Sequence, residues 1–191
     1  MKYERSYRLI DPSRENYCVP ACVRMVMESE KIEMPLMTDD RIATTLGYTN
    51  SDGCRSCLGE RLACNSLMFD LKVPLMVSYV GVPYLMYEED YLLSEMLWRV
   101  CSIPGTHVML GAGFGKQFDQ NRPCPDNGRD HMTLLESWDP NEQILRLINP
   151  IAKSERVSLS VYDMFGLMRN RSWSGLYVAQ GVNLLCSERK I

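Results

Sequence analysis

The chain has 191 residues, of which 46% are hydrophobic, so it can bury one good core and is too short for several independent domains. Its formal net charge is −3 and its pI is about 5.5. Lys and Arg do not gather into a basic run, which excludes the electrostatic signature of a nucleic-acid-binding protein. We therefore predict a single domain over residues 1–191, with no nucleic-acid partner.

The N-terminus is charged from Lys2 to Arg8 and lacks the apolar core of a signal peptide. No apolar run in the sequence approaches the length of a membrane span. Eight cysteines without an export signal favour reduced thiols, although their even number leaves disulfides open. We expect a cytoplasmic protein, and secretion by a route that cleaves no signal peptide stays the open alternative.

Helix signals dominate the first half of the chain. Pro20 suits the first turn of a helix, where its missing N–H needs no partner, and good helix formers continue to Glu28, so the first helix is predicted to begin just after Cys18. Thr38 reads as an N-cap before two aspartates, and Gly47 as the stop of that second helix. The apolar spacing predicts a third helix over residues 90–100.

Strand signals dominate the second half. β-branched and aromatic residues between turn residues predict a strand over residues 71–80 and, after the third helix, strands over residues 107–113, 131–138, 143–149 and 173–179. A short helix is expected over residues 160–168. Helices first and sheet second predict an α+β fold, with an N-terminal helical lobe of about residues 1–101 packed on a C-terminal antiparallel β-sheet lobe of about residues 102–191.

Cys18 is the candidate nucleophile. A thiolate is the reactive form of cysteine, and the unpaired N–H groups and positive dipole end of a helix N-terminus stabilise it. Cys22 lies one turn further along the same predicted helix and lacks that field. The open alternative is that both residues are small buried hydrophobic groups, the usual role of cysteine in a reduced interior.

His131 and His107 are the two histidines of the chain and hence the candidate bases. The strand that begins at His131 meets a turn sequence at residues 139–142 and returns toward Asn149. His107 has no comparable returning strand with a polar residue in register, so we interpret it as structural. This comparison selects His131 as the base.

The register of this hairpin predicts what orients His131. If Trp138 pairs with Gln143, His131 faces Pro150, and a one-residue bulge or slip would place it opposite Asn149. We therefore predict that the Asn149 amide holds the imidazole. The alternative is that Asn149 and Pro150 only end a strand and start a loop.

Three motifs follow one another in the chain. They are Cys18-Val19-Pro20-Ala21-Cys22 before Met25-Val26, the run His131-Met132-Thr133-Leu134-Leu135, and Asn149-Pro150. In this order they resemble the papain-like superfamily and, within it, the bacterial bacteriocin-processing (double-glycine leader) peptidase family. The likeness extends from about Asn16 to Ala179.

The resemblance implies a papain-like fold and a cysteine peptidase, amidase or acyltransferase that works through a thioester. Cys18 would attack an acyl carbon, His131 would accept and return the proton, and Asn149 would hold the imidazole. A peptide or small amide substrate follows from this chemistry. We expect no metal and no cofactor.

Three positions depart from the family pattern. Val19 replaces the usual glycine, and Asn149 the usual aspartate, although asparagine serves this role in papain. Relatives carry an oxyanion-stabilising glutamine six residues before the nucleophile, where this chain has Pro12. Asn16, together with the Cys18 backbone N–H, is the expected substitute for the oxyanion hole.

Two further interpretations stay open. Val19 and the missing glutamine favour an impaired papain-like fold that serves as a binding or regulatory module. Cys54, Cys57 and Cys64 have a spacing that zinc sites use, but no fourth ligand completes a site, so a loop of free cysteines is preferred over a zinc-stabilised interaction protein.

Overall fold

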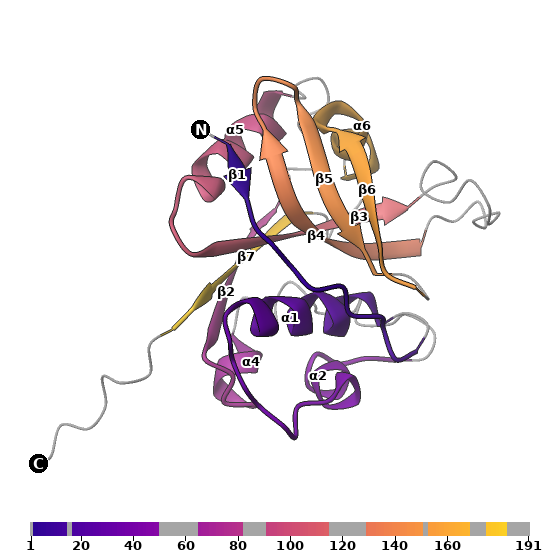
Figure 1. Ribbon diagram of the computed structural model, residues 1–191. Helices are drawn as coiled ribbons and strands as arrows, with labels where there is room; N and C mark the ends of the chain where they lie inside the picture. Colours follow the sequence, from indigo (N-terminus) through magenta and orange to yellow (C-terminus); the bar gives the residue numbers. More distant parts are fainter. Residues whose placement is uncertain are drawn as a thin grey trace, which may run out of the picture.

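The computed structural model describes residues 2–14, 17–49, 65–81, 91–114, 129–150, 153–168 and 175–182. Its elements in chain order are β1 (Tyr3–Glu4), α1 (Cys18–Ser29), α2 (Asp39–Thr45), α4 (Ser66–Phe69), β2 (Leu75–Gly81), α5 (Tyr91–Cys101), β3 (Thr106–Phe114), β4 (Arg129–Asp139), β5 (Ile144–Asn149), β6 (Glu155–Ser160), α6 (Val161–Met168) and β7 (Gly175–Gly181) (Figure 1). Every helix and strand that the sequence predicted is present, and several have shifted ends. The elements β1, α4 and β6 were not predicted.

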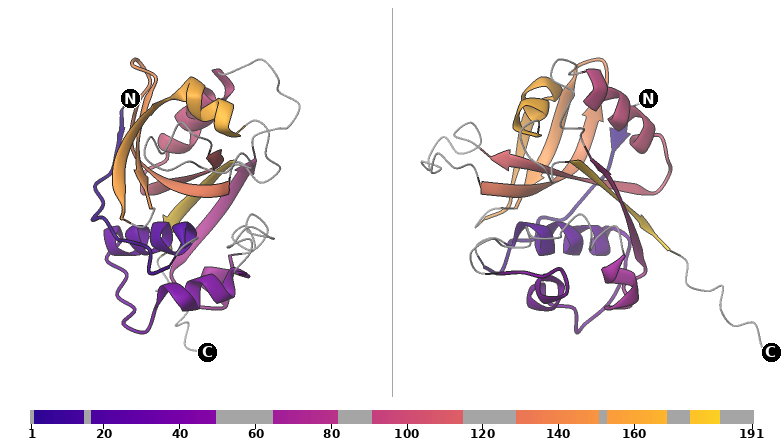
Figure 2. Two further views of the ribbon diagram at one scale, coloured as in Figure 1. Left: turned by 90° about the vertical axis from the view of Figure 1, so that its right-hand side faces the viewer. Right: turned by 180° about the vertical axis from the view of Figure 1, so that it is seen from behind.

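The strands form one antiparallel sheet in the order β2-β7-β3-β4-β5-β6, with β1 paired to β4. The helices α1, α2 and α4 gather on one side of the sheet, and α5 and α6 on the other, as the two views of Figure 2 show. Since β2 pairs with β7, the sheet joins the first part of the chain to the last. The lobe boundary near residue 101 stays a prediction.

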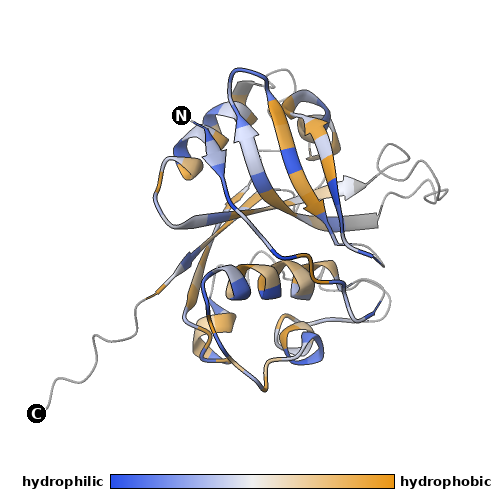
Figure 3. Cartoon of the chain, viewed as in Figure 1, coloured by the Kyte–Doolittle hydropathy of each residue, from blue (hydrophilic) through white to orange (hydrophobic). Residues whose placement is uncertain are grey.

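Two clusters of buried side chains cover the two faces of the sheet. The first joins α1, α2 and α4 to β2 and to one face of the central strands, and the second joins α5 and α6 to the other face. Successive residues of β3 divide between them: Met109 belongs to the first cluster and Leu110 to the second, as the alternation of a strand requires. Figure 3 shows the corresponding hydrophobic stretches along β5 and α6.

The structure confirms the predicted ends of the second helix, α2. The Thr38 side chain accepts a hydrogen bond from the Arg41 N–H at 3.2 Å, which caps the helix start. Gly47 has φ 77° and donates to the Thr44 carbonyl, while Tyr48 donates to that of Ala43. This is the Schellman arrangement, and its left-handed residue explains the glycine.

Other boundaries moved for identifiable reasons. The helix α1 begins at Cys18 itself, with Tyr17 as N-cap, one residue earlier than predicted. The strand β2 begins at Leu75, because Lys72 has φ 58° and Pro74 follows. Leu71 and Val73 are nevertheless buried. Their apolar character indicated burial in the core, and the prediction that they belong to a strand was wrong.

The register of the β4–β5 hairpin was predicted wrongly. Trp138 pairs with Leu145, not Gln143, because Gln143 adopts φ 55° inside the turn. A β-bulge between Leu135 and Ser137 then shifts the pairing by one residue, to Leu134 opposite Ile148. Continued by one step, this register places Asn149 opposite Thr133 and diagonal to His131. No helix in the described ranges is long and apolar enough to cross a bilayer.

Candidate active site

Cys18 lies at the N-terminus of α1, where Tyr17 supplies no side-chain cap. Pro20 occupies the first turn without disrupting a helical hydrogen bond, and the apolar neighbours of Cys18 pack into the first core cluster. Cys18 is 9% exposed. Its thiol therefore lies near the positive end of the helix dipole, in a largely buried position.

Cys22 connects α1 to β4. Its Sγ lies 3.8 Å from the main-chain oxygen of Met132, the residue after His131. Burial, and next the charge of Cys18, raise the pKa of the fully buried Cys22 thiol well above its ordinary value. Cys22 is thus unsuited to be a nucleophile, and its contact holds the helix turn that follows Cys18 against the strand that carries His131.

His131 and Asn149 are joined directly. Nε2 of His131 lies 2.7 Å from Oδ1 of Asn149, across the hairpin. The residues reach each other diagonally, and not face to face as the predicted register required, because an aromatic ring such as the imidazole can reach a diagonal neighbour of an antiparallel pair. Asn149 is only 2% exposed, so its amide has a fixed protein environment.

Burial determines the charge of His131. Desolvation of the ring lowers the pKa of His131 to about 4, although the hydrogen bond to Asn149 acts in the opposite direction. The imidazole is therefore neutral at physiological pH. A neutral imidazole is the form that can accept a proton from a thiol.

Asn149 has a second partner that the sequence did not suggest. Its Nδ2 donates to Oε1 of Glu155 at 3.2 Å, and the two residues are direct partners in the β5–β6 ladder. Glu155 could not be found from sequence, because the polar strand β6 that presents it was not predicted.

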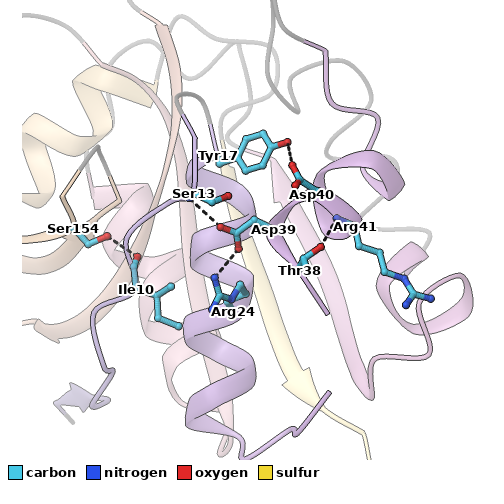
Figure 4. A network of polar contacts seen from close by, with 9 residues as sticks. All are labelled: Ile10, Ser13, Tyr17, Arg24, Thr38, Asp39, Asp40, Arg41 and Ser154. Atoms are coloured by element: carbon cyan, nitrogen blue, oxygen red, sulfur yellow. Dashed lines mark hydrogen bonds and ion pairs between the residues drawn. The ribbon is translucent and has the colours of Figure 1, made fainter. Parts of the chain in front are cut away.

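The segment before Cys18 is tied to α2 and to the start of β6 (Figure 4). Asp39 accepts from the Ser13 N–H at 3.0 Å and pairs with Arg24 at 3.0 Å. The Tyr17 hydroxyl donates to Asp40 at 2.7 Å. Ser154 donates to the carbonyl of Ile10, also at 2.7 Å, from the other side. These contacts anchor both flanks of the segment that leads to Cys18.

Two sequence predictions fall on residues whose structure is not described. Asn16, the expected oxyanion donor, lies between the described ranges, as do Cys54, Cys57 and Cys64. Within the described ranges no group of three or more His, Cys, Asp or Glu side chains could hold a metal ion. The oxyanion role of Asn16 and the interpretation of Cys54, Cys57 and Cys64 as free cysteines therefore stay predictions.

His107 occupies the interior of the first core. It is fully buried, its Nδ1 lies 2.8 Å from the Tyr7 hydroxyl, and its Nε2 lies 2.6 Å from Oε1 of Glu30. Both ring nitrogens have protein partners, and the ring has no access to a substrate. These contacts support the structural interpretation of His107.

A cysteine at the start of a helix that packs on an antiparallel sheet, with a His–Asn pair on that sheet, is the arrangement of the papain-like α+β fold, and the chain has this fold. It is similar to the crystal structure of a double glycine motif protease from an AMS/PCAT transporter in complex with the leader peptide. The two share 14% identity at a TM-score of 0.52, over 95% of this chain and 99% of that chain. No family model and no curated protein matches the sequence.

Proposed function

We propose that the protein is a cysteine peptidase or amidase in which Cys18, His131 and Asn149 act together. The observation that carries the proposal is the 2.7 Å contact between His131 and Asn149, in a papain-like fold whose α1 begins at Cys18. Each residue type has the role it needs: a thiol as nucleophile, a neutral imidazole as base and an amide as orienter.

The proposed reaction has two halves. The Cys18 sulfur attacks the acyl carbon while Nδ1 of His131 takes the thiol proton, and the imidazolium then protonates the departing amine. A thioester on Cys18 remains. Water, deprotonated by the same Nδ1, attacks the thioester, the C–S bond breaks to release the acid, and the imidazolium returns its proton to the Cys18 sulfur. An amine in place of water would make the enzyme an acyltransferase.

We propose a peptide as the substrate class. The similar protease was solved with a leader peptide, and its fold covers nearly all of this chain. The Cys18 backbone N–H and the Asn16 side chain are the proposed donors to the oxyanion. Removal of one such donor is expected to lower the rate by about two orders of magnitude.

Selective alkylation tests the proposal. Iodoacetamide at pH 7, followed by peptide mass spectrometry, should modify Cys18 ahead of Cys22 and Cys101. Burial raises the pKa of Cys101 to about 12 and that of Cys22 well above its ordinary value, so both are protonated at pH 7. His131→Ala should slow the modification of Cys18 about tenfold or more, and Cys18→Ala should abolish cleavage of a peptide substrate.

The exposed Glu142, in the β4–β5 turn, provides the control. In the Glu142→Gln variant, iodoacetamide should modify Cys18 at the wild-type rate. A Cys18 that reacts no faster than a free thiol such as glutathione, and is indifferent to His131→Ala, would overturn the proposed function.

A binding module is the second candidate, favoured by the low exposure of Cys18, which is 9%. Under this hypothesis a leader-type peptide binds wild type and Cys18→Ala equally, as measured by calorimetry, and an electrophilic acyl probe leaves Cys18 unmodified. A covalent adduct at Cys18 would support the enzyme hypothesis over the binding module.

A further inference from the structure

Glu155 contacts the amide that holds His131. Asn149 is almost completely buried, so both ends of its amide need partners within the protein. One end lies 2.7 Å from Nε2 of His131, and the other lies 3.2 Å from Oε1 of Glu155. Glu155 itself is exposed. The three side chains thus form a row from the surface of β6 to the imidazole.

The chemistry of the three side chains fixes the direction of each hydrogen bond in the row. An ionised carboxylate can only accept a hydrogen bond, so the NH₂ group of Asn149 must face Glu155. The amide oxygen then faces His131, which requires Nε2 to carry the ring proton. In the neutral ring the lone pair is left on Nδ1, the atom that the proposed reaction uses as base.

We propose that Glu155 is a positioning residue, which sets the orientation of the Asn149 amide and, through it, the tautomer of His131. Without an acceptor at position 155 the amide can turn by half a rotation and present its NH₂ group to Nε2, which favours the other tautomer. The inference rests on the proposed function for its catalytic meaning, but the tautomer can be measured without catalysis.

The row also accounts for an amide at position 149. An aspartate there would place a second carboxylate against Glu155, since the two residues are direct cross-strand partners. Like charges at this distance destabilise each other and raise the pKa of one of them. An amide at position 149 and a carboxylate at position 155 therefore belong together.

Nitrogen-15 NMR of the imidazole at pH 7 tests the tautomer. Wild type and Glu155→Gln, whose amide oxygen still accepts, should show the proton on Nε2 of His131. Glu155→Leu has no acceptor and should show a mixture of tautomers, with alkylation of Cys18 slowed about tenfold, the effect of one lost hydrogen bond. Glu142→Leu is the matched control and should resemble wild type. An unchanged tautomer in a folded Glu155→Leu protein overturns the inference.

Substitution of Asn149 gives a second, independent test. Asn149→Asp should slow alkylation of Cys18, and Asn149→Asp combined with Glu155→Gln should recover most of the rate, because the second change removes the like charge. Equal losses in the single and double variants contradict the inference. If wild-type Cys18 is unreactive, the proposed function fails while the tautomer result still decides the role of Glu155.

Discussion

His131 should titrate far below an ordinary histidine. Burial of the ring lowers the pKa of His131 to about 4, and the hydrogen bond that His131 donates to Asn149 partly offsets this shift. We expect the His131 ring signals in proton NMR of Cys18→Ala to titrate with a midpoint near pH 4. Asn149→Ala removes the contribution that raises the pKa, so its midpoint should be lower still. A midpoint near 6.5 in Cys18→Ala would contradict the buried environment.

At the same scale, the helix start at Cys18 and the predicted hairpin from His131 to Asn149 were sufficient to select these three residues as candidates, although the predicted register was wrong. The sequence could not supply their geometry. The diagonal contact between His131 and Asn149 depends on the left-handed conformation of Gln143 and on the bulge near Glu136. The residue types at these two positions do not indicate either feature. Glu155 was missed because its strand is polar and its partner was not known.

The elements differ in how far sequence predicts them. The α2 helix was placed by its capping residues, which act within a few positions of the chain, and the structure confirms both ends. The strands β1 and β6 have no such local signal. The β1 strand has two residues and exists only by pairing with Trp138 and Ser137. Such a strand is defined by its distant partner.

The first turn of α2 offers a test of how the segment before Cys18 is held. Asp39→Ala leaves the Ser13 N–H and the partly buried Arg24 without their partner, and should lower the free energy of unfolding by about 2 to 3 kcal/mol in urea denaturation. Asp40→Ala is the comparison variant: it loses the same favourable interaction with the helix dipole and, in addition, the hydrogen bond from the Tyr17 hydroxyl. Asp40 is half-exposed, so its loss should cost about 1 kcal/mol or less.

Alkylation of Cys18 extends this test from stability to the site. If the contact with Asp39 positions the segment, Asp39→Ala should also slow the modification of Cys18, in protein that circular dichroism shows to be folded. Equal stability losses in the two variants would show that the buried ion pair contributes little.

For the whole molecule, the lowered pKa values of the two histidines lead us to expect that acid destabilises the fold. Burial lowers the pKa of both His131 and His107, so the unfolded chain takes up protons near pH 6.5 while the folded chain resists them. Between pH 6.5 and about 4 the unfolded state therefore binds more protons, and the free energy of unfolding falls as the pH falls. His131 alone accounts for about 2 to 3 kcal/mol of this loss.

Urea denaturation of wild type and His131→Gln at several pH values isolates this contribution, because the carboxylates titrate equally in both proteins. The stability difference between the two should shift in favour of His131→Gln as the pH falls from 7 to 4. Parallel pH profiles would show that His131 keeps an ordinary pKa.

The place of β7 in the sheet bears on when the fold can be completed during synthesis. This strand follows all other described elements in the chain, yet it lies between β2 and β3 in the sheet. The ribosome makes Cys18 before β7, so the sheet cannot be completed until translation has passed Gly181. Under the proposed function, a nascent chain would thus carry the Cys18 thiol before the sheet that holds His131 and Asn149 is complete.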